Sequence, residues 1–374
     1  MQKITIFALH LDYGGIEKYI SYFCKMFEKK YNIEIICTYK MNSTPAFEFS
    51  KNINIRYLIE SNPRDVSLKD LLKKGKICSA LKELIKRIKI KSEAYKKNKE
   101  EAIKLDSDFV LTTREYHNKI VNKYSPKKII KIATEHNYHN NDKKYIKKLV
   151  DSVTNFDYFV ISTNELYDYY KNKVKPRCVL ISNPVIIEND SKSKLNNKNI
   201  ISVGRLSPEK GFEDLLDVMK IINSIDSEIK LTIAGDGYLR DKIENKIAAL
   251  GIEENVKLTG FINGKKLEKA YSNASLYVMP SISECFGLVL LEAMHYGLPC
   301  ISFDDASGPR EILSNGTGIL IENRDKEKMA KEIVKLFNNK ELLNKYSKNS
   351  LKKVNEYSTD KITKVWEKEI LNNN

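Results

Sequence analysis

The sequence predicts an α/β protein of two doubly wound domains that face each other. In the first half of the chain, short apolar strands alternate with amphipathic helices, a polar stretch then interrupts the alternation, and the same layout restarts. The length of 374 residues also exceeds what a single hydrophobic core usually serves. Strands separated by helices need crossover connections, which give parallel sheets.

The first half opens with a buried strand, a Gly-Gly turn and an amphipathic helix at 16–30. Strands are predicted at 3–11, 33–39, 108–113, 128–135, 158–163 and 178–182. The apolar residues of each run are flanked by turn-forming or polar residues, as in buried strands of parallel sheets.

The polar stretch at 188–199 has no apolar periodicity, which is typical of a linker. After it, strands are predicted at 199–204, 231–237, 255–261, 275–280, 299–304 and 318–322. We therefore place the first domain at 1–186, the linker at 187–198 and the second domain at 199–354, followed by a C-terminal helix at 355–374.

Composition indicates a cytoplasmic protein. The longest apolar runs are far shorter than the roughly 20 residues of a membrane-spanning helix. The N-terminus lacks the pattern of a signal peptide. The six cysteines show no paired spacing, so free thiols are expected.

The net charge of +15 is concentrated in one segment. Residues 69–99 hold 12 lysines and arginines against 3 acids, a local net charge of +9. Apolar residues recur there at helical spacing, which predicts a basic amphipathic helix. One interpretation is contact with an anionic membrane, and another is an ordinary solvated helix. A nucleic-acid surface is the least favoured, because no aromatic interleaving accompanies the charge.

Three predicted strand-to-helix turns could hold an anion, because helix N-termini present free N–H groups and a positive dipole end. The first contains Gly14 and Gly15, which let a ligand approach the backbone closely, although an ordinary tight turn explains them equally well. The second is GRLSPEKGF at 204–212, where Arg205 and Lys210 flank a helix start. Two cations in that position suit a pyrophosphate.

The third turn lies in SISECFGLVLLEAMHYG, which places Glu284 just before a helix and Glu292 in its second turn. Backbone amides around Phe286, Gly287 and Leu288 would face a phosphate, while a carboxylate accepts from sugar hydroxyls. Helix capping by Glu284 and a surface ion pair for Glu292 are the alternatives. The apolar neighbours of Glu292 weaken the second of these.

Glu284 and Glu292, with seven residues between them, resemble the E-x7-E motif of family 4 glycosyltransferases. GRLSPEKG resembles that family's donor-phosphate loop, and DYGGIEKYI resembles its N-terminal Gly-Gly loop. The resemblance implies a GT-B fold: two Rossmann-like domains with a nucleotide-sugar cleft between them. It also implies that the last helix returns to the N-terminal domain.

For the donor site, the resemblance implies that Arg205 and Lys210 bind the diphosphate and that Glu292 holds the ribose hydroxyls. Glu284 would contact the donor sugar, and Phe261 lies on the loop that holds the base. The remaining donor contacts would come from the backbone at Gly14, Gly15, Phe286, Gly287 and Leu288.

For the chemistry, the resemblance implies retaining transfer of a hexose-type sugar without a metal or other cofactor. His136 and Glu284 are the expected catalytic residues, with His139 as the alternative histidine. UDP is the expected nucleotide and GDP its alternative. The expected acceptor is a glycan or a lipid-linked molecule of bacterial surface polysaccharide synthesis, at the inner face of the cell membrane and with no nucleic acid involved. Two alternatives remain: a GT-B glycosyltransferase that acts on a protein or a soluble acceptor, and a non-catalytic GT-B partner subunit.

Overall fold

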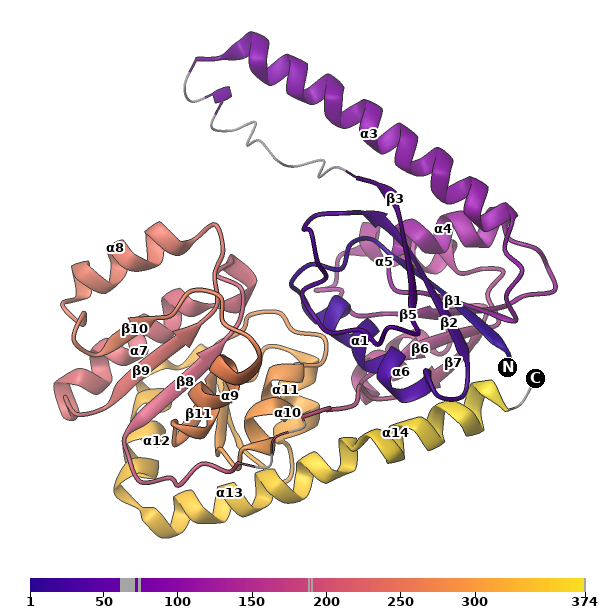
Figure 1. Cartoon of the computed structure of the whole chain (residues 1–374). Helices are drawn as coiled ribbons and strands as arrows, with labels where there is room; N and C mark the ends of the chain where they lie inside the picture. The colour runs from indigo at the N-terminus through magenta and orange to yellow at the C-terminus, as the bar shows by residue number, and fades with distance from the viewer. Residues whose placement is uncertain (61–70, 73–74, 188, 190, 373–374) are drawn as a thin grey trace. The chain divides into compact units, whose positions relative to one another are not determined.

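The computed structural model describes residues 1–60, 71–72, 75–187, 189 and 191–372 (Figure 1). The chain forms two compact units. Unit 1 contains Met1–Ser162, Tyr167–Ile181 and Val365–Asn374, and unit 2 contains Thr163–Leu166 and Ser182–Lys364. Each unit is built on a parallel sheet, so the predicted α/β class with two doubly wound domains is confirmed.

In the described part of the chain, the sheet of unit 1 has seven strands in the order β3-β2-β1-β4-β5-β6-β7. They are β1 (Lys3–Ala8), β2 (Asn32–Tyr39), β3 (Asn54–Ile59), β4 (Phe109–Thr112), β5 (Ile130–Thr134), β6 (Tyr158–Ile161) and β7 (Arg177–Leu180). The helices between these strands are α1 (Gly15–Phe27), α3 (Ile77–Ile103), α4 (Glu115–Tyr124), α5 (Lys143–Ser152) and α6 (Asn164–Tyr170), the last of which has its residues up to Leu166 in unit 2. The sequence analysis did not predict β3, an edge strand that is mostly half-exposed and so carries a weak apolar signal.

The sheet of unit 2 has six strands among the described residues, in the order β10-β9-β8-β11-β12-β13. They are β8 (Asn199–Val203), β9 (Lys230–Ala234), β10 (Val256–Leu258), β11 (Leu276–Met279), β12 (Cys300–Phe303) and β13 (Ile319–Ile321). The α-helices are α7 (Phe212–Ile225), α8 (Arg240–Leu250), α9 (Gly264–Ser272), α10 (Leu288–His295), α11 (Ser307–Leu313), α12 (Lys326–Asn338) and α13 (Lys340–Val354). Helix α14 (Thr359–Trp366) begins in unit 2, and its last two residues belong to unit 1. Short 3-10 turns lie at η1 (Pro208–Lys210), η2 (Glu322–Arg324) and η3 (Asn355–Tyr357), and Glu367–Leu371 forms a π-helical turn.

Each sheet has one reversal point, a pair of adjacent strands from which the following strands are added outward in opposite directions. In unit 1, strands are added outward from β1 on one side and from β4 on the other; in unit 2, the same holds for β8 and β11. Because parallel crossovers are right-handed, this reversal puts helices on both faces of each sheet. Ligands of such folds bind beyond the carboxyl ends of the two strands at the reversal.

The expected linker belongs to unit 2 by its contacts. The chain leaves unit 1 after Ile181, and beyond it Ser193 N–H donates to the Tyr296 carbonyl at 2.9 Å. The Asn189 side chain donates to Glu268 at 3.0 Å. These polar groups of the predicted linker therefore hydrogen-bond to the second unit.

The end of the chain belongs to unit 1 from Val365 onward. There Trp366, which is 1% exposed, meets the rings of Phe23 and Phe27 of α1 edge-on, at centroid distances of 5.1 and 6.4 Å. The Glu367 carboxylate pairs with Lys30. Burial of Trp366 against these two phenylalanines stabilises the packing of the C-terminal segment on α1.

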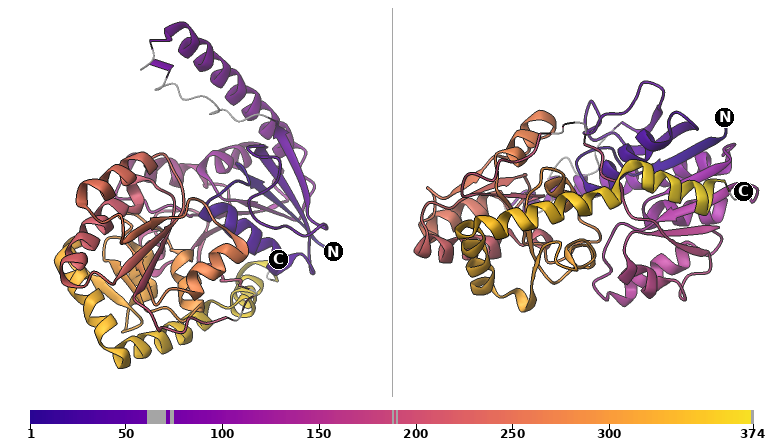
Figure 2. Two further views of the ribbon diagram at one scale, coloured as in Figure 1. Left: turned by 60° about the vertical axis from the view of Figure 1, so that its left-hand side comes forward. Right: turned by 90° about the horizontal axis from the view of Figure 1, so that it is seen from below.

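Helix α3 confirms that a helix occupies most of the basic segment at 69–99. Positions 69–70 and 73–74 of that segment lie outside the described residues. Both Figure 1 and Figure 2 show the N-terminal half of α3 extending beyond the sheet of its own unit. Five apolar side chains on one face of that half are between 44 and 70% exposed: Ile77, Leu81, Leu84, Ile85 and Ile88.

Candidate active site

The loops after β8 and β11 meet at the reversal point of the second sheet. The loop after β8 carries Arg205 and ends in η1 at Lys210, and the loop after β11 carries Glu284. These loops bring the Lys210 ammonium into an ion pair with the Glu284 carboxylate, 74 residues away in sequence. Arg205 is exposed in the same loop. The structure therefore brings the second and third of the predicted strand-to-helix turns together at one edge of the sheet.

Backbone packing fixes the spacing of these two loops. Gly211 has a left-handed φ of 65°, and a Cβ there would lie 2.1 Å from the Pro280 carbonyl oxygen. A side chain at this position is therefore excluded both by conformation and by contact. The glycine lets the turn after Lys210 lie directly against the segment that leads to Glu284.

Arg324 also connects the loops at this edge, and the sequence analysis missed it. Its guanidinium donates to Asp214 Oδ2 at 2.6 Å and to the Pro280 carbonyl at 2.9 Å, and it pairs with Asp305 at 2.5 Å. It thus ties the start of α7 to the ends of β11 and β12. No motif distinguishes this arginine in the sequence, since its partners lie between 19 and 110 residues away.

Glu292 lies inside α10, in its second turn, as predicted. Its side chain is only 3% exposed, and Tyr271 donates its hydroxyl to Oε2 at 3.2 Å. The Tyr271 ring in turn stacks on Tyr296 at 5.3 Å with an interplanar angle of 10°. The carboxylate is therefore hydrogen-bonded and fixed in orientation, which explains how an acid is accommodated in an apolar helix.

The N-terminus of α10 presents backbone amides beside Glu284. Gly287 precedes the helix with a left-handed φ of 89°, so that Leu288 is the first helical residue. The Phe286 side chain is 3% exposed and packs edge-on against Tyr357, which leaves only its backbone for a ligand. Phe261, on the loop after β10, is 41% exposed.

In unit 1, His136 follows the carboxyl end of β5. Its ring lies 4.3 Å from the Tyr19 ring, and its Nε2 is 2.8 Å from Thr134 Oγ1. Burial lowers the pKa of His136 to about 3, and the positive charge of Arg114 adds to the effect. The imidazole is therefore neutral across the physiological pH range.

Glu135 holds the backbone of the His136 loop. One carboxylate oxygen accepts from the amides of His136 at 2.9 Å and Asn137 at 2.6 Å, and the other accepts from the Tyr145 hydroxyl at 3.0 Å. Burial raises the pKa of Glu135 to about 7, against the opposing effect of these donors. The alternative histidine, His139, is 6% exposed, accepts from the Asn141 amide and stacks on Tyr138.

The Gly-Gly turn lies at the reversal point of the first sheet, where α1 begins at Gly15. A Cβ at Gly15 would meet nothing within 4 Å, so no packing contact in the described structure requires glycine there. Beside this turn, the Arg114 guanidinium that follows β4 donates to Glu17 of α1 at 2.7 Å. The pair joins the two loops at the reversal point.

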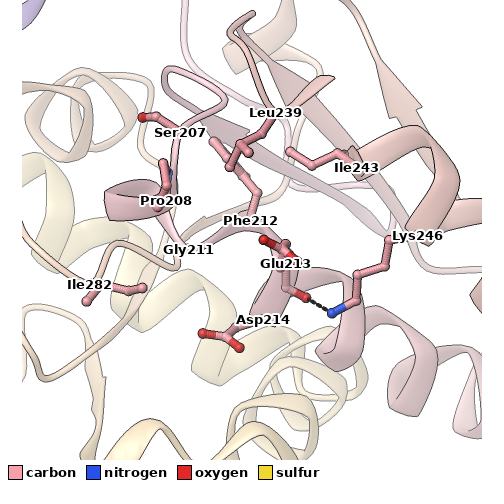
Figure 3. A pocket seen from close by; sticks show the side chains of 10 residues that line it. All are labelled: Ser207, Pro208, Gly211, Phe212, Glu213, Asp214, Leu239, Ile243, Lys246 and Ile282. Atoms are coloured by element: carbon pink, nitrogen blue, oxygen red, sulfur yellow. Dashed lines mark hydrogen bonds between the residues drawn. The ribbon is translucent and has the colours of Figure 1, made fainter. Parts of the chain in front are cut away.

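A cavity of about 310 Å³ lies beside the turn that precedes α7 (Figure 3). Figure 3 shows Ser207 and Pro208 at the start of η1, Asp214 of α7, and Leu239 and Ile243 at the start of α8 in its walls. None of the predicted donor residues lines it.

In the described residues, no group of three or more histidine, cysteine, aspartate or glutamate side chains is arranged to hold a metal ion. No helix in the described ranges is both long and apolar enough to span a membrane.

The sequence matches the family described as "Glycosyl transferases group 1" over residues 186–353. A protein of the cps region of Klebsiella pneumoniae is 31% identical in an alignment of 263 positions that covers 63% of this chain and 68% of that protein. The chain belongs to the group 1 glycosyl transferases. The poly(ribitol-phosphate) alpha-N-acetylglucosaminyltransferase of Staphylococcus aureus is 32% identical over 188 residues, 50% of this chain and 38% of that enzyme.

The likeness of this group 1 glycosyl transferase to solved structures extends over both units. The crystal structure of an S. aureus TarM mutant in complex with Fondaparinux, alpha-GlcNAc-glycerol and UDP matches 98% of this chain and 99% of that chain, with a TM-score of 0.79 and 17% identity. This likeness confirms the predicted GT-B fold. Three of the curated relatives are matched over 40, 61 and 34% of their own lengths, so the chain spans less than two thirds of each.

Proposed function

We propose that the protein is a retaining glycosyltransferase that moves a hexose-type sugar from a nucleotide-sugar to a glycan or lipid-linked acceptor of bacterial surface polysaccharide. One observation carries this proposal: Lys210 and Glu284 meet at the reversal point of the second sheet, beside the α10 N-terminus that also leads to Glu292. In a nucleotide-sugar, the diphosphate would bind the cation and the backbone amides at the helix N-terminus, and sugar hydroxyls would donate to the carboxylate. The S. aureus enzyme that transfers N-acetylglucosamine to poly(ribitol-phosphate) supports the choice of acceptor class.

Each donor group then has a partner. Arg205 and Lys210 bind the diphosphate, together with the backbone amides of Gly287 and Leu288. Glu292, already oriented by Tyr271, accepts from the ribose hydroxyls. The remaining expected contacts are Glu284 with the sugar, Phe261 with the base, and the backbone of Gly14, Gly15 and Phe286.

In the proposed reaction, the leaving diphosphate is stabilised by the Arg205 and Lys210 cations. The departing phosphate accepts the acceptor's proton on the face where the new bond forms, which retains the anomeric configuration. His136 and Glu284 position the transferred sugar. UDP is the proposed nucleotide, in keeping with its presence in the TarM complex.

Thermal-shift measurements with a panel of UDP- and GDP-sugars, followed by turnover with the best binder, test this proposal. We expect UDP-sugars to stabilise the protein, slow hydrolysis of one of them, and loss of both effects in Lys210→Ala. A purified chain that binds no nucleotide-sugar would instead be the non-catalytic partner subunit. Efficient transfer to a protein or a free sugar would favour the soluble-acceptor alternative.

We also propose that α3 brings the protein to the anionic inner face of the cell membrane. Its exposed apolar stripe of Ile77, Leu81, Leu84, Ile85 and Ile88 lies on a helix whose lysines outnumber its acids. Apolar side chains that do not pack on their own unit, beside cations, suit the interface of an anionic bilayer. Each lysine near such a surface contributes about 1 kcal/mol.

Sedimentation with vesicles, with and without anionic lipid, tests the membrane contact. We expect binding only to anionic vesicles, and its loss when four lysines of α3 are replaced by glutamine: Lys82, Lys86, Lys89 and Lys91. A matched control replaces four exposed lysines of unit 2: Lys220, Lys257, Lys331 and Lys340. Equal binding of the two variants would exclude α3 as the contact.

A further inference from the structure

Thr134 and His136 lie two residues apart at the end of β5, where the chain is extended. Side chains at positions i and i+2 of extended chain point to the same side, which brings Thr134 Oγ1 to 2.8 Å from His136 Nε2. Thr134 is also buried, at 4% exposure. Its hydroxyl is therefore a fixed neighbour of the imidazole.

The hydroxyl of Thr134 has a second contact, at 3.2 Å to the Thr112 carbonyl oxygen of the adjacent strand β4. A carbonyl oxygen can only accept, and a hydroxyl has one proton. With the Thr134 proton directed at the Thr112 carbonyl, the hydroxyl oxygen accepts from the imidazole. On that assignment His136 Nε2 carries a hydrogen.

A neutral imidazole has one N–H, so a hydrogen on Nε2 leaves Nδ1 with a free lone pair. Burial lowers the pKa of His136 to about 3, which keeps the ring neutral. Nδ1 makes no hydrogen bond to any residue that the structure describes, and the Tyr19 ring packs against the imidazole and restricts its rotation.

We infer that Thr134 is a positioning residue that fixes His136 as the Nε2–H tautomer, so that Nδ1 offers the substrate a hydrogen-bond acceptor. The role toward substrate rests on the proposed function, whereas the tautomer does not. The acceptor nitrogen selects a substrate hydroxyl, which can donate, over an ether or carbonyl oxygen at the same place. His136 would thus orient the sugar without taking up its proton.

Nitrogen-15 NMR of histidine-labelled protein tests the tautomer, with the His136 signals assigned by their loss in His136→Gln. We expect a protonated Nε2 and an unprotonated Nδ1 in the wild type and in Thr134→Ser, which keeps the hydroxyl. Thr134→Val should shift the population toward Nδ1–H. Thermal unfolding of both variants checks the fold, because threonine and valine are not equivalent in a core.

Hydrolysis of the best-binding nucleotide-sugar tests the link to function. We expect kcat to fall about five- to tenfold in Thr134→Val with KM for the donor unchanged, the size of effect of one neutral hydrogen bond, and to recover in Thr134→Ser. A protonated Nδ1 in the wild type, or an unchanged spectrum in Thr134→Val, would overturn the inference. The expected spectra without turnover of any nucleotide-sugar would support the tautomer and refute the proposed function.

Discussion

Replacement of Lys210 by methionine removes one partner of the ion pair between η1 and the β11–α10 loop. In the proposed complex, Lys210 binds both the Glu284 carboxylate and the donor diphosphate, so Lys210→Met leaves two anionic groups facing each other. A hydrogen bond to a charged group contributes about 1.5–3 kcal/mol, which corresponds to a 10- to 100-fold weaker Kd for UDP. Repulsion from Glu284 adds to this loss.

The effect on stability is smaller. The Lys210 and Glu284 side chains are 23 and 17% exposed, so water screens the pair in part. A value of about 1 kcal/mol is reasonable for such a pair and corresponds to a fall in Tm of about 2–4 °C for a unit of this size. Because Lys210→Met with Glu284→Gln leaves no unpaired charge, the double variant should regain most of the Tm and none of the UDP affinity.

Calorimetric titration with UDP and thermal unfolding of the single and double variants measure both effects. Lys242→Met is a matched control, since Lys242 pairs with Glu213 at 2.9 Å on the surface of the same unit. The control should leave the Kd for UDP unchanged. A normal Kd in Lys210→Met with a lowered Tm would show that the pair only holds the loops together, and would refute the proposed role in donor binding.

Three further variants have distinct expected outcomes. Glu292→Gln should weaken UDP binding about tenfold, whereas Glu284→Gln should mainly lower turnover; equal effects on the Kd for UDP would contradict their separate roles. The pKa of Glu135 is about 7 in the folded protein and 4.5 ordinarily, so the folded state binds its proton more tightly and this residue's stabilising contribution falls as pH rises from 4.5 to 7. Glu135→Gln should remove this pH dependence. The difference in the free energy of unfolding between variant and wild type, measured by urea unfolding, should therefore change by about 3 kcal/mol between pH 4.5 and 7. Parallel pH profiles of the two proteins would contradict the raised pKa of Glu135. Trp366→Ala should destabilise unit 1 by about 3–5 kcal/mol and speed amide exchange in α1, and unchanged exchange there would show that the contact with Phe23 contributes little.

Strong local patterns made most of the fold predictable. Buried strands such as β4 and β11 are continuous apolar runs, and the glycines at Gly211 and Gly287 mark turns where the structure has left-handed backbone. The alternation of strands and helices then fixed the class. By contrast, α13 and the short α11 were not predicted, because polar residues dominate the first and the second has only 7 residues.

The site was predictable where its groups share a short motif. Glu284 and Glu292 are ordered by one loop and one helix, so their spacing carries the information. Arg324 and Thr134 act through partners on other strands, and nothing in their own neighbourhood distinguishes them from other arginines and threonines. The outward-facing apolar stripe of α3 is a related case, because periodicity shows an apolar face without showing what covers it.

The return of the chain to unit 1 at Val365 has a consequence for biosynthesis. A ribosome releases the N-terminal sheet long before it has made Trp366, so Phe23 and Phe27 of α1 lack this packing partner until the chain of unit 2 up to Lys364 has been made. Nascent chains therefore carry an apolar surface on α1 through the synthesis of all of unit 2. Expression of the first 181 residues alone would make that exposed state permanent, and we expect such a fragment to recruit chaperones or aggregate.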